Sequence, residues 1–285
     1  MATKKLSDRI IEATPGIDAL AAALHKAYEP LLGQDGPKAV KDALYGVWLG
    51  HPLHPAVVTM PIGFWTTTML LDLMGEEKVA DLSLKLGTVS ALAAAASGAA
   101  QWQDTYNLEK PRRLGALHAA LNITATTLYG ASWVARARGS RGVGVALSTT
   151  AFGMANFSAW MGGDLSYDLG IGVNRTAFEQ PPTEWTDVVA DADLPDGKLT
   201  RVEAEGTAIV LLRQGSEIRA ISAVCTHLGG PLDEGEIEGD AVVCPWHKSV
   251  FSLTDGKVIH GPATSPEPAY ETRVQGGQVQ VRAVA

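Results

Sequence analysis

Four long stretches without Asp, Glu, Lys or Arg constrain the fold of this chain more than any other feature. They cover residues 48–71, 86–103, 114–135 and 142–163, and each is 18 to 24 residues long. A helix needs about 20 apolar residues to cross a hydrocarbon core of about 30 Å. Charged residues gather between the stretches, as expected of loops. The pattern predicts four transmembrane helices over residues 48–175, with a buried helical bundle of a soluble protein as the alternative.

The segments on either side of this region have a different character. Residues 1–47 hold short amphipathic helical patterns and no apolar run typical of a secretory signal, so we expect a helical lead. Residues 176–183 are typical of a linker. From residue 184, short alternating runs separated by Gly, Asp and Pro predict an all-β domain. The expected fold class is α+β in two domains: a four-helix transmembrane bundle, then an all-β domain over 184–285.

The acidic charge of the chain is confined to its last part. Residues 184–285 carry 8 basic and 16 acidic side chains, whereas residues 1–183 carry 15 of each. An acidic domain is repelled by nucleic acid and favours partners with basic patches. We therefore expect no nucleic-acid partner and a protein partner with a basic docking patch.

Antiparallel spans would bring a group of polar side chains to one face of the membrane. Ionisable groups at membrane depth are costly, so each is a functional hypothesis. Imidazoles on facing helices also commonly hold haem or metal ions. His54 and His118 are therefore candidates for a membrane site, as haem or metal ligands, as part of a quinone or proton site, or as polar groups at helix ends. The predicted polar layer consists of His51, His54, Gln101, Gln103, Asp104, His118, Asp164 and Tyr167.

Each of the two cysteines has a histidine close by in the sequence. Cys225 precedes His227 in the string CTHLGGPL, and Cys244 precedes His247 in CPWHKSVF. Two thiolates and two imidazoles can bind zinc tetrahedrally. The spacing and the flanking strings, however, resemble a Rieske [2Fe–2S] domain over residues 184–285. The resemblance implies that the cysteines hold one iron and the histidines the other, with a reduction potential above that of an all-cysteine ferredoxin.

Further residues of the all-β domain match the same family. The GPATSPEP stretch from Gly261 resembles the proline-rich loop that covers the cluster. Ser249 matches a serine that donates to a cluster sulfide, whereas Phe251 stands where high-potential members have Tyr. The resemblance implies a potential in the lower part of the range of about −150 to +300 mV. His25 and His260 have no evident partner, and we expect both at the surface.

Residues 45–175 resemble a bacterial four-span membrane family of undefined function that often occurs beside redox domains. The matching features are the HPLHP run from His51, Pro61, His118 and the GGDLSYDLGIGV string from Gly162. Thr59 and Met60 stand where members carry His-Phe, which weakens the haem interpretation.

Together the two parts predict a membrane-anchored Rieske protein, an oxidoreductase component more than a stand-alone catalyst. It would carry single electrons between a membrane donor, such as quinol or haem, and a partner such as an oxygenase or reductase. Alternatives are a two-cofactor conduit with haem in the bundle and a redox sensor without turnover. With no cysteine left for a disulfide and no signal sequence, we expect a multi-pass protein of the bacterial inner membrane with its cluster domain in the cytoplasm.

Overall fold

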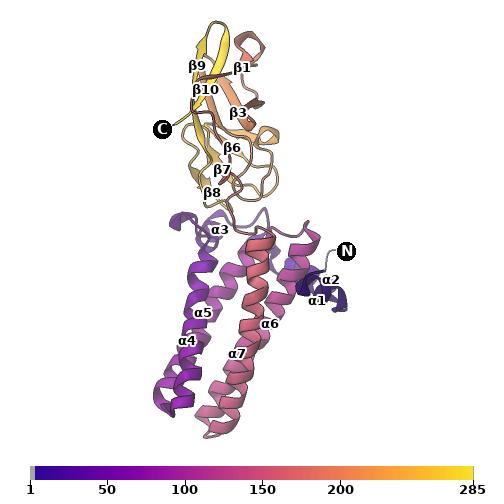
Figure 1. Ribbon diagram of the computed structural model, residues 1–285, viewed down its shortest axis with the longest axis vertical. Coiled ribbons are helices and arrows are strands. Elements are labelled where there is room, and N and C mark those ends of the chain that lie inside the picture. The colour runs from indigo at the N-terminus through magenta and orange to yellow at the C-terminus, as the bar shows by residue number, and fades with distance from the viewer. Residues whose placement is uncertain (1–3, 285) are drawn as a thin grey trace. The chain divides into compact units, whose positions relative to one another are not determined.

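The computed structural model describes residues 4–284, which form two compact units (Figure 1). The first unit contains the chain up to Pro37 and the segment Pro52–Ile171. The second contains Lys38–His51 together with the chain from Gly172 onward. The expected lead over 1–47 is therefore divided, because its third helix belongs to the unit that is formed mainly by the C-terminal residues.

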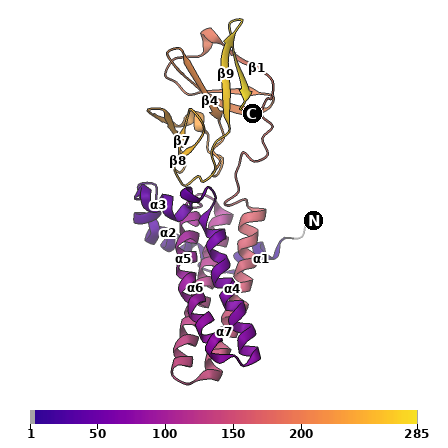
Figure 2. The same cartoon turned by 90° about the vertical axis from the view of Figure 1, so that its left-hand side faces the viewer.

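The first unit is helical, and four long helices lie side by side in both views (Figures 1 and 2). Two shorter helices precede them and a π-helical turn, Asp164–Asp168, follows. Two of the long helices, α4 and α5, are long and apolar enough to cross a membrane. The helical character of this region is confirmed, whereas crossing by all four helices stays a prediction. The helices are α1 Leu6–Ala13, α2 Ile17–Leu32, α4 Leu53–Met74, α5 Glu77–Gln103, α6 Glu109–Ala137 and α7 Arg141–Gly163.

Small residues occupy many of the buried positions in the bundle. They include Ala80, Gly87, Ala91, Gly144 and Ala151, which allow helices to approach closely. Large apolar side chains are exposed on the outer faces of all four helices, among them Leu70, Leu73, Leu92, Ile123 and Val143. So many exposed apolar side chains are unusual for a water-soluble bundle.

The bundle is built from two helical hairpins, α4–α5 and α6–α7. Each residue of the first hairpin corresponds to the residue 64 positions later in the second. Three pairs show the correspondence: His54 with His118, Gly75 with Gly139, and Gly98 with Gly162. Gly75 and Gly139 both adopt left-handed backbone, with φ of +78° and +79°, at the turns between the helices. A strained turn conformation that only glycine adopts easily is thus repeated at corresponding positions.

Corresponding residues of the two hairpins also contact each other. The rings of Trp65 and Tyr129 stack with centroids 4.1 Å apart and an interplanar angle of 7°. Arg136 donates from Nη1 to Asp72 Oδ1 at 2.8 Å. Contact between a residue and its own counterpart is what a two-fold axis produces. The two hairpins are therefore related by an approximate two-fold axis.

The second unit contains two antiparallel sheets, so the all-β character predicted for the C-terminal part is confirmed. The larger sheet has the order β1-β10-β9-β4-β3-β2 and the smaller one β5-β6-β7-β8. Helix α3, Lys38–Tyr45, and the short helical turn Val47–Leu49 also belong to this unit. The strands are β1 Thr186–Ala190, β2 Thr200–Ala204, β3 Thr207–Gln214, β4 Glu217–Ser222, β5 Glu236–Glu238, β6 Ala241–Val243, β7 Val250–Ser252, β8 Val258–His260, β9 Ala269–Gln275 and β10 Gln278–Ala283.

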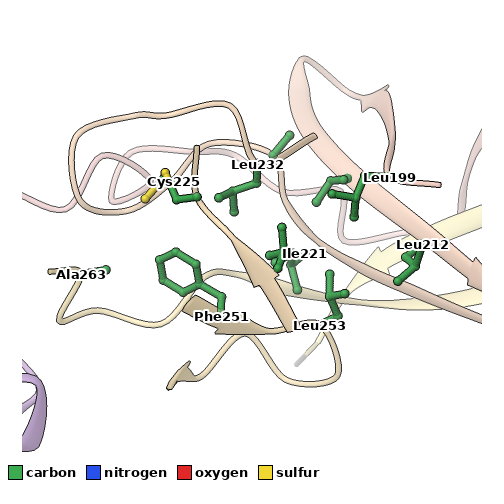
Figure 3. Close-up of a cluster of buried hydrophobic side chains, with 12 residues drawn as sticks. Leu199, Leu212, Ile221, Cys225, Leu232, Phe251, Leu253 and Ala263 are labelled. Carbon is green, nitrogen blue, oxygen red and sulfur yellow. The ribbon is translucent and has the colours of Figure 1, made fainter. Parts of the chain in front are cut away.

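A buried apolar cluster between the sheets includes both cysteines. Figure 3 shows Leu212 at one end of this cluster, and Cys225, Phe251 and Ala263 at the other. The side chains of Cys225 and Phe251 are almost completely buried. The core thus provides a rigid, dry support for the loops that carry the cysteines.

The predicted linker over 176–183 is fixed to the second unit. Thr207 Oγ1 donates to Gln180 O at 2.8 Å, and Ala283 N donates to Pro182 O at 2.8 Å. Immediately before the linker, Arg175 N donates to Thr226 O at 3.0 Å. The segment that follows the helical unit therefore packs against the loop between Cys225 and His227.

Candidate metal centre

The first cysteine begins a tight loop that follows strand β4. Gly229 N donates to Cys225 O, and Cys225 N donates to Gly230 O, both at 2.9 Å. Gly229 has a φ of +83°, in the left-handed region that glycine adopts at little cost. The closed turn fixes the directions of the Cys225 and His227 side chains.

The second cysteine begins a loop of the same geometry after strand β6. Lys248 N donates to Cys244 O at 3.1 Å, and Cys244 N donates to Ser249 O at 2.8 Å. Lys248 also has a positive φ, +64°, although it is not glycine. The CTHLGG and CPWHKS strings therefore form the same hydrogen-bonded turn, each with a cysteine at its start.

The predicted ligand side chains of the two loops lie near one another. The rings of His227 and His247 are perpendicular, with centroids 5.0 Å apart. The two thiols are close enough to shift each other's pKa. A Cβ atom on Gly230 would lie 2.8 Å from Cys244 Sγ, so glycine leaves room beside that sulfur. The residues present fit a group held by two sulfurs on one side and two ring nitrogens on the other.

The protonation equilibria of His227 and Cys244 favour metal ligation, whereas that of Cys225 does not. Burial holds the pKa of His227 well below its ordinary value, so the ring stays neutral, which is the form that binds metal. The neighbouring Cys225 thiol lowers the pKa of Cys244 to about 7, which favours the metal-binding thiolate. The Cys244 thiol and burial raise the pKa of Cys225, so in the absence of metal this thiol keeps its proton.

A zinc ion and a two-iron cluster make different demands on these four side chains. A structural zinc ion needs four ligands around one centre. In a Rieske cluster each iron takes only two protein ligands. Two turns of the same hydrogen-bonding pattern, each with one cysteine and one histidine, match the ligand set of a two-iron cluster.

The predicted proline-rich loop is bonded to both ligand loops. Ala263 N donates to Ser249 Oγ at 2.9 Å, and Thr226 Oγ1 donates to Ser265 O at 2.9 Å. Thr226 N also donates to Glu267 Oε1 at 2.7 Å. Because burial is its largest influence, the pKa of Glu267 is raised well above the ordinary carboxyl value. The loop covers the site and fixes the backbone between Cys225 and His227.

Two histidines expected at the surface without partners both have partners, and one of them is buried. His25 is buried, stacked on Trp102 with centroids 3.8 Å apart, and its Nδ1 lies 3.1 Å from Gln103 Oε1. His260 Nδ1 lies 2.8 Å from Asp42 Oδ2. These partners are 78 and 218 residues away in the sequence, so no local spacing indicates them.

His54 and His118 make equivalent contacts in the two hairpins. His54 Nδ1 lies 2.9 Å from Ala94 O, and His118 Nδ1 lies 2.8 Å from Ser158 O. The other ring nitrogen of His118 lies 3.1 Å from Asn122 Nδ2. Each ring also lies against the corresponding glycine of the neighbouring helix. The sequence analysis did not predict this duplicated histidine–carbonyl contact. The 64-residue offset between the two histidines is the sequence signal that indicates it.

The structure describes contacts for some of the remaining members of the predicted polar layer. His51 belongs to the second unit, whereas the others belong to the first. Gln103 is buried and donates to the Glu29 carboxylate at 2.8 Å. Tyr167 is 93% exposed. The described contacts connect Gln103 to helix α2, and a shared polar layer stays a prediction.

The fold and the paired loops define a small iron–sulfur electron-transfer domain attached to a helical unit. Comparison with known families agrees: residues 184–275 match the Rieske [2Fe–2S] domain, and residues 50–175 match a family described as predicted membrane protein (DUF2231). The chain belongs to the Rieske [2Fe–2S] family, its domain carries a Rieske-type cluster, and a DUF2231 domain precedes that domain.

Three similar proteins each match about a third of this chain and most of their own length. The ferredoxin CarAc of Metapseudomonas resinovorans is 34% identical over 98 residues, which are 34% of this chain and 92% of CarAc. The 3-phenylpropionate/cinnamic acid dioxygenase ferredoxin subunit of Escherichia coli K12 is 38% identical over 89 residues, or 31% of this chain and 83% of that subunit. The solved ferredoxin of carbazole 1,9a-dioxygenase from Nocardioides aromaticivorans IC177 is 26% identical, with a TM-score of 0.34, over 36% of this chain and all of that protein.

Proposed function

We propose that this protein is a membrane-anchored Rieske ferredoxin that passes single electrons from a membrane donor to an oxygenase-type partner. The observation that carries the proposal is the pair of identical hydrogen-bonded turns with Cys225 and Cys244 at their starts. The Escherichia coli K12 relative is by name the ferredoxin subunit of a dioxygenase, which supports a carrier more than a catalyst.

The residues of the site have distinct proposed roles. Cys225 and Cys244 hold one iron, and His227 and His247 hold the other. The cluster supplies reversible one-electron exchange near the potentials of membrane donors. The turns and the buried core keep the four side chains in place, so little reorganisation accompanies each transfer. The loop from Gly261 excludes water from the sulfur side.

The proposed anchor is the helical unit, with α4, α5, α6 and α7 each crossing the membrane of a bacterial cell. Its outward apolar side chains and its small interior residues support this, because lipid and not water would solvate such a surface. Hydroxyl groups along the helices bond to their own backbone, as when Thr66 Oγ1 donates to Ile62 O at 2.8 Å. An even number of spans places the segment before α4 and the segment after α7 on the same side of the membrane. We assign this side to the cytoplasm.

The proposed protein partner presents a basic surface. The second unit is acidic, and complementary charge speeds the encounter of redox proteins. By analogy with the dioxygenase ferredoxins, the partner is an oxygenase or a related hydroxylase.

A second candidate function is a conduit with haem in the bundle. It is favoured by the symmetric His54 and His118, because metal-binding imidazoles usually donate from the other nitrogen to a carbonyl oxygen. The contact between Asn122 and His118 competes with such ligation. A quinone bound at the same two residues, and a sensor whose oxidation state alters the bundle, are the remaining alternatives.

The deciding experiment is an optical spectrum of the detergent-purified full chain, oxidised and then reduced with dithionite. Broad visible bands that bleach on reduction, with no sharp bands, are expected for the carrier. Added sharp haem bands that disappear in the His54→Ala and His118→Ala variants would establish the conduit instead. Absence of electron transfer to any protein acceptor, combined with a redox-dependent change in the bundle, would favour the sensor.

A further inference from the structure

The second unit contains a segment for which the ferredoxin CarAc has no room. Residues 38–51, which hold α3, pack on the C-terminal domain although about 120 residues separate them from it in the sequence. The 98 residues that match CarAc make up 92% of that protein, which leaves about 9 residues outside the match. So short a remainder has no room for a counterpart of this 14-residue segment. The segment is an addition to an already complete domain.

One carboxylate binds the added segment to the loop that covers the site. Asp42 Oδ1 accepts from Gly261 N at 2.8 Å, and Asp42 Oδ2 lies 2.8 Å from His260 Nδ1. A Cβ atom on Gly261 would lie 2.8 Å from Val47 Cγ2, so the two chains approach closely. The contact is specific, because both carboxylate oxygens have a defined partner.

The same segment lies against a predicted cluster ligand. The Tyr45 ring meets the edge of His227, with centroids 6.4 Å apart, and Tyr45 is only 2% exposed. Lys41, one turn earlier on the same face of α3, is 4% exposed. By contrast Trp246, beside His247, is 47% exposed. The added segment therefore covers the His227 side of the site and leaves the Trp246 side open.

We propose that residues 38–51 are an intramolecular cap that occupies the electron-exchange surface at His227, so that a protein acceptor reaches this edge only after the cap has moved away. The proposal rests on the electron-carrier function proposed above. The docked form is a resting state, and the apparent rate of electron transfer depends on the fraction of molecules with the cap released. Each transfer takes one electron from the reduced cluster and reduces one acceptor haem, without transfer of a proton.

The cap is tested by releasing it in the full-length, detergent-purified protein. Asp42→Ala removes both polar contacts with the 260–261 loop, and Asp35→Ala, at an exposed position of the same lead, is the matched control. Reduction of cytochrome c by the reduced protein, measured by stopped flow, is expected to be roughly tenfold faster for Asp42→Ala. This factor corresponds to the free energy that hydrogen bonds to a charged group contribute to cap docking. The control is expected to match the wild type, and the visible spectrum and potential stay unchanged in both variants.

A second variant locks the cap and tests the opposite direction. Val47→Cys with Gly261→Cys places two Cβ atoms within the about 3.5–4.5 Å that a disulfide spans. The oxidised double variant is expected to reduce cytochrome c at less than about a tenth of the wild-type rate, while the single Val47→Cys variant is unaffected. Equal rates for the released, locked and wild-type proteins would overturn the cap. Failure of the wild type itself to reduce cytochrome c would instead overturn the carrier function.

Discussion

At the scale of single residues, the side chains around the cysteines set the reduction potential. Phe251 is fully buried beside Cys225 and offers no hydrogen-bond donor (Figure 3). A hydroxyl that donates to a cluster sulfur stabilises the reduced form, and a hydrogen bond of about 1 kcal/mol corresponds to roughly 40 mV for one electron. We predict that Phe251→Tyr raises the potential by about that amount in a redox titration, whereas Phe178→Tyr, at an exposed position, leaves it unchanged. An unchanged or lowered potential in Phe251→Tyr would contradict this assignment.

His25 makes the docking of α2 sensitive to pH. Burial lowers the pKa of His25 below its ordinary value of 6.5, so the docked helix binds fewer protons than the free helix. The docking free energy is therefore fully present above pH 6.5 and decreases as the pH falls toward the lowered pKa, by at most about 1.4 kcal/mol per pH unit. Hydrogen exchange of the α2 amides is expected to accelerate below pH 6.5 beyond the intrinsic rate. His25→Gln should abolish this extra acceleration, and its persistence would exclude His25 as the cause.

At the scale of elements, the two hairpins of the helical unit are joined by a buried ion-pair network at their turn ends. The Arg136 and Asp72 side chains are 2% and 6% exposed, and Arg141 and Asp81 complete the network. Removing one member of a buried pair leaves an uncompensated charge at a cost of about 3–5 kcal/mol. We predict a loss of this size for Arg136→Ala in unfolding of the helical unit, followed by far-UV circular dichroism. Arg138→Ala, at an exposed position just after the same helix, should change stability by less than about 0.5 kcal/mol.

The double variant Asp72→Leu with Arg136→Met separates the cost of an unpaired charge from the cost of lost packing. It removes both charges, and Arg141 retains Asp81 as a partner. The double variant should therefore recover most of the stability that Arg136→Ala loses, because apolar pairs often replace buried ion pairs without cost. Equal losses in the single and double variants would show that packing, and not the unpaired charge, determines the effect.

Local and distant elements differ in how far the sequence predicts them. The helices and the ligand loops follow from charge-free stretches and from cysteine–histidine spacings of a few residues, so sequence reading finds both. The contacts of α3 join Asp42 to residues more than 200 positions away, and no periodicity indicates such a pairing. The internal duplication was detectable in principle, since His54 and His118 share their register with paired glycines. Each hairpin differs at most other positions, which hides the repeat from a search for motifs.

At the scale of the whole molecule, the two units have separate apolar cores. The helical core includes Trp65, Leu84 and Tyr129, whereas the core beneath the cysteines is formed by residues of the β unit. Loss of a cluster ligand is therefore expected to disturb only the second unit. We predict that His227→Ser abolishes the visible cluster bands but leaves the helical circular dichroism signal and its thermal transition in place. His260→Gln, which removes an imidazole outside the ligand quartet, should retain the bands. Simultaneous loss of the bands and of helicity in His227→Ser would mean that the cluster stabilises one cooperative unit, and the membrane domain would then depend on its redox domain to fold.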